Sequence, residues 1–158
     1  MQKISDHITY NECIHSDVAK RYGIKNYFSL DQLERMKLLA EKVFEPLRNY
    51  FNVPIFISSF FRSLQLNKLI GGAVKSQHLA NNGAAIDLDA QVYDLITNRQ
   101  IFIYIKDNLE FDQLVWEFGD LNEPAWVHVS YNEIRNRKQI LRSYRSGGVT
   151  FYEEYNMI

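Results

Sequence analysis

The sequence predicts an α+β fold in which helices pack on a small antiparallel sheet. Helical patterns come first along the chain, and strand-like runs follow them. Two of these runs, DQLVWEF at 112–118 and AWVHVSY at 125–131, are joined by GDLNEP, whose Gly, Asn and Pro residues suit a hairpin loop. Helices followed by paired strands are typical of the α+β class.

Two short helices are expected near the N-terminus. Thr9 and Glu12 have the spacing of a capping box, in which each side chain binds a backbone N–H that the first turn leaves free. Ser16 precedes the run DVAKRYG, and Gly23 at the end of that run is a typical helix-terminating residue.

A long amphipathic helix is the clearest element in the sequence. It begins at Ser29, with Gln32 three residues on, and apolar residues recur at helical spacing as far as Phe51. Pro46 within this pattern predicts a bend, because proline lacks a backbone N–H and its ring clashes with the preceding turn.

The remaining elements include both strands and helices. VPIFISS at 53–59 has the β-branched and aromatic density of a strand, and a short helix is expected at about 64–70, ended by two glycines. AAIDLDA at 84–90 predicts a short strand, and a helical pattern returns from about Tyr93 to Leu109. Beyond Tyr131 the chain is more polar, and its pattern indicates no clear element.

Composition and charge narrow the classes of function. The 158 residues are expected to form one domain, residues 1–158, and their 46% hydrophobic and 23% charged content is ordinary for a globular protein. A formal net charge of -1 favours neither a nucleic-acid partner nor a membrane surface. The single cysteine, Cys13, has no partner for an internal disulfide.

The sequence also bears on where the protein is made. The N-terminal run MQKISDHITYNECIH carries charged and polar residues every few positions and lacks the apolar region of a secretory signal. No stretch approaches the roughly 18 to 20 apolar residues of a membrane span. We therefore expect a protein that is cytoplasmic when made and has no membrane span.

Three residues have the chemistry of a zinc site. His78 is expected in a loop, Asp87 on the strand that follows, and His128 on the second hairpin strand, with Val127 and Val129 on the opposite face. Neutral imidazole and carboxylate suit zinc, and three protein ligands with one open position are typical of a catalytic site. In a chain with four histidines, the same grouping could also arise by chance.

Several other polar residues are weighed for a role beside this cluster. A carboxylate must take a proton from the attacking water, and both Glu117 on the first hairpin strand and Glu123 in the hairpin loop are candidates. Asp89, two residues beyond the aspartate of the cluster, is either a supporting group or a solvated carboxylate. His7 and His15 lack a partner at ligand spacing and are expected on the surface.

The sequence around the cluster resembles a known superfamily. SQHLANNGAAID resembles the S-x-H…G-x-A-x-D signature of the D-alanyl-D-alanine carboxypeptidase and hedgehog-like zinc peptidases, which include vancomycin-resistance dipeptidases and phage endolysins. WVHVSY resembles the strand that supplies their third ligand, and FISSFFRS resembles their I-S-S-G-[YF]-R-S segment. The similarity extends from about residue 6 to about residue 142.

The resemblance implies a role for each site residue. It implies a zinc cofactor bound by His78, Asp87 and His128. It further implies that Glu117 is the general base and that Arg62 and Ser76 bind the substrate. A guanidinium and a hydroxyl suit a substrate carboxylate or carbonyl, although Arg62 could instead form a surface ion pair. Glu117 is favoured because WEFG matches the glutamate that the family carries just before the hairpin turn.

The sequence departs from the family pattern at two places. Residues 79–86 separate the first histidine from the aspartate, two residues more than is usual in the family. The extra residues fall before Gly83, where a bulged loop is expected to absorb them without moving Asp87 off its strand. Phe60 replaces a frequent glycine, which leaves the local shape of the cleft open.

The resemblance implies the hedgehog and D,D-peptidase fold and cleavage of an amide bond in a peptidoglycan stem peptide. We expect an endolysin-like murein endopeptidase that acts on the cell wall after release. It is expected to be a monomer whose partner is the stem peptide and not nucleic acid. Two alternatives stay open: a D,D-carboxypeptidase of the same family, and a non-catalytic zinc-containing wall-binding or virion structural module. A carboxylate near the open zinc position would favour an enzyme.

Overall fold

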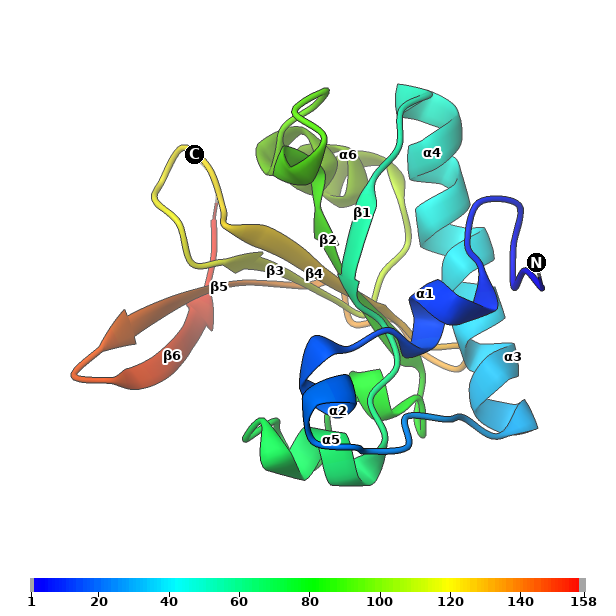
Figure 1. Cartoon of the computed structure of the whole chain (residues 1–158). Coiled ribbons are helices and arrows are strands. Elements are labelled where there is room, and N and C mark those ends of the chain that lie inside the picture. The colour runs from blue at the N-terminus through cyan, green and yellow to red at the C-terminus, as the bar shows by residue number, and fades with distance from the viewer. Residues whose placement is uncertain (1, 157–158) are drawn as a thin grey trace.

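A mixed six-stranded sheet forms the centre of the molecule (Figure 1). The computed structural model describes residues 2–156. The strand order is β1-β2-β4-β3-β5-β6, and the strands are β1 Phe56–Ser59, β2 Ala84–Asp89, β3 Gln113–Glu117, β4 Trp126–Tyr131, β5 Gln139–Ser146 and β6 Val149–Glu154. Neighbouring strands are antiparallel except for β3 and β5, which are parallel.

The α+β class is confirmed. The sequence predicts a small, antiparallel sheet, but the observed sheet has six strands and one parallel pair. The difference arises beyond Tyr131, where the polar segment forms β5 and β6. Gly147 and Gly148 both have positive φ angles, of 56° and 81°, which a tight two-residue hairpin turn requires. Residues 132–138 carry the chain past Gln113, where β3 begins, so β5 runs opposite to β4 and therefore parallel to β3.

Short helices surround the sheet. They are α1 Tyr10–Ile14, α2 Asp17–Arg21, α3 Leu30–Leu39, α4 Glu45–Phe51, α5 Leu64–Leu69 and α6 Asn98–Asn108, with a π-helical segment η1 Ala40–Phe44 and the 3₁₀ turns η2 Gln77–Leu79 and η3 Ala90–Val92. Capping boxes at Thr9 and Ser29 confirm two predicted helix starts, and the Ser16 hydroxyl caps α2. None of the helices within residues 2–156 has the length and apolar character to cross a membrane.

Two of the predicted helices differ from the observed ones. The long helix is continuous through Phe51, but η1 interrupts its regular hydrogen bonding just before Pro46. Because Pro46 has no N–H, the ordinary ladder cannot pass through it, and the wider π turn accommodates the lost bond. The helix predicted from Tyr93 starts only at Asn98, since Thr97 and Gln100 form a capping box that fixes its first turn there.

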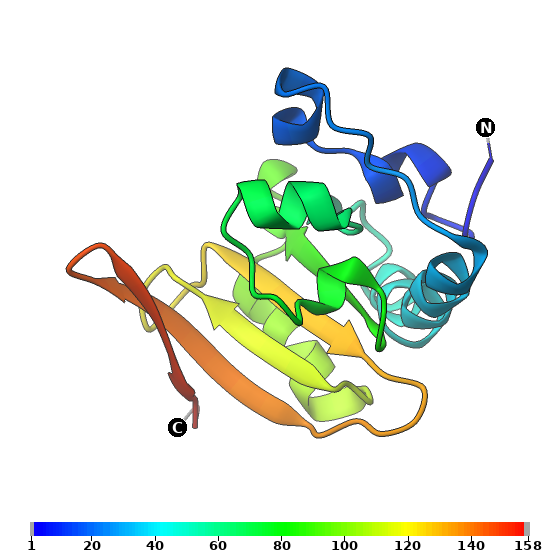
Figure 2. The ribbon, with the colours of Figure 1, turned by 90° about the horizontal axis from the view of Figure 1, so that it is seen from below.

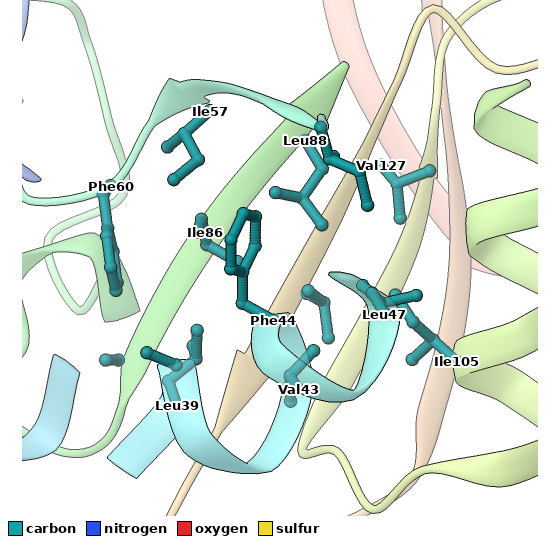
Figure 3. Packing of buried hydrophobic residues seen from close by; sticks show 14 of the residues in the cluster. Leu39, Val43, Phe44, Leu47, Ile57, Phe60, Ile86, Leu88, Ile105 and Val127 are labelled. Carbon is teal, nitrogen blue, oxygen red and sulfur yellow. The ribbon is translucent and has the colours of Figure 1, made fainter. Parts of the chain in front are cut away.

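One face of the sheet carries the hydrophobic core. Ile86 and Leu88 on β2 pack with Val127 of β4 and with Phe44 and other apolar residues of the helices (Figure 3). α3 and α6 pack against the sheet from this side, whereas α5 and α6 lie on opposite sides of it (Figure 2). Because side chains alternate along a strand, the residue between Ile86 and Leu88 points to the face that the core leaves open.

Candidate metal centre

Neighbouring strands place two of the predicted ligands side by side. Asp87 on β2 and His128 on β4 are direct partners in the antiparallel register, and their side chains lie on the face opposite the core. His78 comes from η2, the turn that precedes β2. The Ser76 hydroxyl caps this turn and accepts the backbone N–H of His78 at 3.4 Å. The structure thus brings the three predicted ligands together from three separate segments.

Two of the three separations between ligand atoms in this cluster match those of a tetrahedral zinc site, and the third is shorter. Asp87 Oδ1 lies 3.2 Å from His78 Nε2 and 2.8 Å from His128 Nδ1, and the two nitrogens are 3.3 Å apart. Zinc bonds of about 2.0–2.1 Å in a tetrahedron separate neighbouring ligand atoms by roughly 3.3 Å. His78, Asp87 and His128 therefore form a group that can hold a metal ion.

The protein backbone fixes which nitrogen His78 offers. His78 Nδ1 donates to the carbonyl oxygen of Phe60 at 2.7 Å, so that Nε2 presents its lone pair to the cluster. Burial lowers the pKa of His78, although Asp87 opposes this effect, and the neutral ring is the form that binds metal. The Phe60 side chain itself is buried in the core (Figure 3), so it does not obstruct the open face of the sheet.

Asp87 is held as a carboxylate by groups on both of its oxygens. Oδ1 faces the two histidines, and Oδ2 accepts from Arg62 Nη2 at 2.8 Å. Burial on its own would raise the pKa of Asp87, but the neighbouring His78 and His128 hold it well below its usual range. Arg62 also donates from Nε to Ser59 Oγ at 3.0 Å, so the guanidinium is held beside Asp87 by two hydrogen bonds in a part-buried ion pair, not in a surface one.

The lengthened loop before β2 is anchored to α3. Gln32 donates to the carbonyl oxygen of Leu79 at 2.8 Å, and Arg35 donates to that of Ala80 at 3.2 Å. Ala80 and Gly83 adopt positive φ angles of 52° and 83°, which turn the chain back toward the sheet. The two extra residues are accommodated in this loop, and Asp87 keeps its predicted place on the strand.

Glu117 lies on the same open face as the cluster. On β3, Val115 is the direct partner of His128, and Glu117 follows two residues later on the same side. Burial raises the pKa of Glu117, whose exposed fraction is only 6%, while the hydroxyl of Ser143 opposes this shift. A buried carboxyl with a raised pKa, beside a metal site, is typical of a general base.

The other candidate base has a structural role. The side chain of Glu123 accepts the backbone N–H of Arg99 at 3.0 Å, at the N-terminal turn of α6. Asp89 accepts from Gln91 N and from Asn98 Nδ2, so it is a local cap next to η3. Neither residue lines the cleft that contains the metal cluster.

A cleft of about 880 Å³ surrounds the cluster. Its lining includes Glu117 and His128, residues 71–73 and 75–77 of the segment before β2, and Tyr152 of β6. Both predicted substrate-binding residues, Arg62 and Ser76, line it as well. His7 and His15 are exposed elsewhere, as the sequence predicts.

Sequence reasoning missed the contribution of the β5–β6 hairpin. Ser143 on β5 donates to Glu117, and Tyr152 on β6 lines the cleft. The one signal that could have found this hairpin is the Gly147-Gly148 pair between two segments with strand-forming residues.

A comparison with known protein families adds an independent observation. A family model described as Peptidase M15 matches residues 6–130. This range covers well over half of the chain and includes the cluster and Glu117, but it ends before β5 begins. No curated protein matches the chain.

Proposed function

The chain belongs to the peptidase M15 family of zinc-dependent peptidases, and from this premise we propose that it is a murein endopeptidase that hydrolyses an amide bond in peptidoglycan stem peptides. The superfamily resemblance in the sequence is thereby confirmed. The observation that carries the proposal is the convergence, in one cleft, of a metal-binding cluster and a buried carboxylate.

The donor set of the cluster fits zinc. Two imidazole nitrogens and one carboxylate oxygen are ligands that zinc accepts, and the cluster opens to the cleft on its remaining side. We propose that His78, Asp87 and His128 hold the ion. Bound there, zinc would supply a Lewis acid for the scissile carbonyl and make the attacking water more acidic.

The protein's own residues would carry the proton. We propose that Glu117, which lies on the strand beside that of His128, takes the proton from the attacking water and passes it to the departing amine. Its raised pKa suits both steps, because a carboxylate of ordinary pKa is a weaker base. Arg62 holds Asp87 in place throughout, through the 2.8 Å bond to Oδ2.

The charge of the cleft supports an anionic peptide as the substrate. Three cationic side chains line the cleft: Arg62, Lys75 and Arg137. The first and last are paired with Asp87 and Asp112, whereas Lys75 has no ion-pair partner within residues 2–156. Lys75 is adjacent to Ser76, so an ammonium and a hydroxyl can meet a substrate carboxylate together. Stem peptides carry such free carboxylates.

The decisive experiment is digestion of purified peptidoglycan by the zinc-loaded protein, with the new termini identified by mass spectrometry. An endopeptidase frees new amino termini within or between stem peptides and lowers the turbidity of permeabilised cells. Release of D-alanine with an intact sacculus would instead identify a D,D-carboxypeptidase. If a sample shown to contain zinc yields neither product, that result would contradict a murein peptidase and favour the binding or structural module. The Glu117→Gln variant is the matched inactive control.

A further inference from the structure

A row of three side chains crosses β3, β5 and β6, and the first and last of them line the cleft. Glu117 on β3 is the direct partner of Ser143 on β5, and Ser143 is the direct partner of Tyr152 on β6. Directly paired residues lie on the same face of a sheet, so all three side chains point to the face that carries the cluster. Ser143 and Tyr152 lie beyond residue 130, where the family match ends.

The hydroxyl of Ser143 makes two hydrogen bonds with opposite roles. It accepts the backbone N–H of Phe118 at 3.1 Å, and it donates to Oε2 of Glu117. Because the N–H occupies the acceptor side of the oxygen, the hydroxyl hydrogen is directed at the carboxylate. Ser143 is only 3% exposed, so water has little access to compete for either bond.

Charged and titratable groups from other elements also face Glu117. His128 on β4 and Arg62 favour its charged form, whereas Asp87 on β2 disfavours it, and Tyr152 on β6 stands on the far side of Ser143. Within residues 2–156, Ser143 is the side chain that donates a hydrogen bond to Glu117. This donor holds one carboxylate oxygen, Oε2, and no side chain within residues 2–156 donates to the other, Oε1, while Glu117 itself lines the cleft.

We propose that Ser143 is a positioning residue, which holds the Glu117 carboxylate in the orientation that accepts a proton from the attacking water. The proposal rests on the proposed function, in which Glu117 is the general base. It assigns a part in the reaction to the β5–β6 hairpin, which lies outside the residues matched by the family.

The test compares Ser143→Ala with a matched control, Ser146→Ala, which makes the same change at an exposed position of the same strand. The carboxyl carbon of Glu117 is titrated by NMR in the zinc-loaded protein and assigned with Glu117→Gln. Loss of a hydrogen bond to a charged group is expected to raise the pKa of Glu117 by about one pH unit in Ser143→Ala. No shift is expected in Ser146→Ala.

Kinetics on murein fragments provide the second readout. We expect kcat to fall about tenfold in Ser143→Ala with KM unchanged, because substrate binding does not involve this hydroxyl. Adding Ser143→Ala to Glu117→Gln should lower the rate no further, since the serine acts through the glutamate. An unchanged titration of Glu117, or equal losses in both backgrounds, would overturn the proposal. If the wild type cuts no murein, the proposed function fails, while the NMR titration still decides the role of Ser143.

Discussion

Arg62 and Asp87 form a part-buried ion pair beside His78 and His128, with 2.8 Å between Nη2 and Oδ2. This contact uses the carboxylate oxygen that the histidines leave free. Through it Arg62 holds one oxygen of Asp87, a proposed zinc ligand, in addition to the substrate contact that the resemblance implies.

Arg62→Lys is expected to weaken zinc binding by about 10- to 100-fold, the usual cost of losing a group that orients a ligand. The lysine side chain ends in a compact ammonium group without the planar fork of a guanidinium, so it cannot hold both Asp87 Oδ2 and Ser59 Oγ. Competition with a chromophoric chelator measures the affinity, and Arg135→Lys at an exposed position is the control. Unchanged zinc affinity together with a raised KM would show that Arg62 binds substrate only.

The wild-type protein is expected to bind one zinc ion per chain, and His128→Ala is expected to lose it. The reason is that three side chains bind the ion in the wild type, whereas the two that remain in His128→Ala leave it free to exchange. Metal analysis after dialysis measures the occupancy, with His15→Ala as the matched control on the surface. Full occupancy at unchanged affinity in His128→Ala would exclude that ligand.

Glu117→Gln is expected to lower kcat by about 10²–10⁴-fold while zinc stays bound, because the amide cannot take a proton. Glu123→Gln should remain active, since Glu123 caps α6 and does not line the cleft. Rates of murein-fragment hydrolysis and zinc content are measured together for both variants. An inactive Glu123 variant beside an active Glu117 variant would reverse the assignment.

As the pH is lowered from neutrality, the activity is expected to decline at a higher pH than it would with a glutamate of ordinary pKa. Burial raises the pKa of Glu117, and the base acts only when it is unprotonated, so kcat/KM declines as the pH falls through this raised value. The pH profile of kcat/KM measures this decline. Ser143→Ala should move the decline to a still higher pH, since the Ser143 hydroxyl lowers the pKa of Glu117.

Glu117→Gln is also expected to unfold at a higher temperature than the wild type near neutral pH. A carboxyl whose pKa is raised by folding binds its proton more tightly in the folded state, so its ionised form opposes folding at pH values above that pKa. The difference in melting temperature should shrink as the pH falls and Glu117 becomes protonated. Thermal melts of both proteins in a chelator, at several pH values, measure this effect, and an unchanged difference would contradict it.

Local signals in the sequence predicted much of the fold and the candidate site. The capping boxes at Thr9 and Ser29 act within one helical turn, so they can be recognised from residues three apart. The alternation around Asp87 and His128 likewise places their side chains on one face before any register is known. The convergence of the cluster followed from the family resemblance rather than from spacing alone.

The features that were not predicted depend on distant parts of the chain. The parallel pairing of β3 with β5 is set by where residues 132–138 cross the sheet, and no local pattern encodes that path. The bond from Ser143 to Glu117 joins residues whose proximity exists only once this pairing has formed. The contact of Arg62 with Asp87 similarly joins two motifs that the sequence keeps apart.

The β5–β6 hairpin has a further consequence for the solution behaviour of the protein. If the sheet ended at β3, the outer backbone groups of the strand that carries Glu117 would form an open edge, a template for pairing with other chains. The edge is instead β6, where Glu153 and Glu154 place charges on the last strand. Charged side chains on an edge strand discourage edge-to-edge aggregation, so the hairpin shields the strand of the proposed base from association with another molecule.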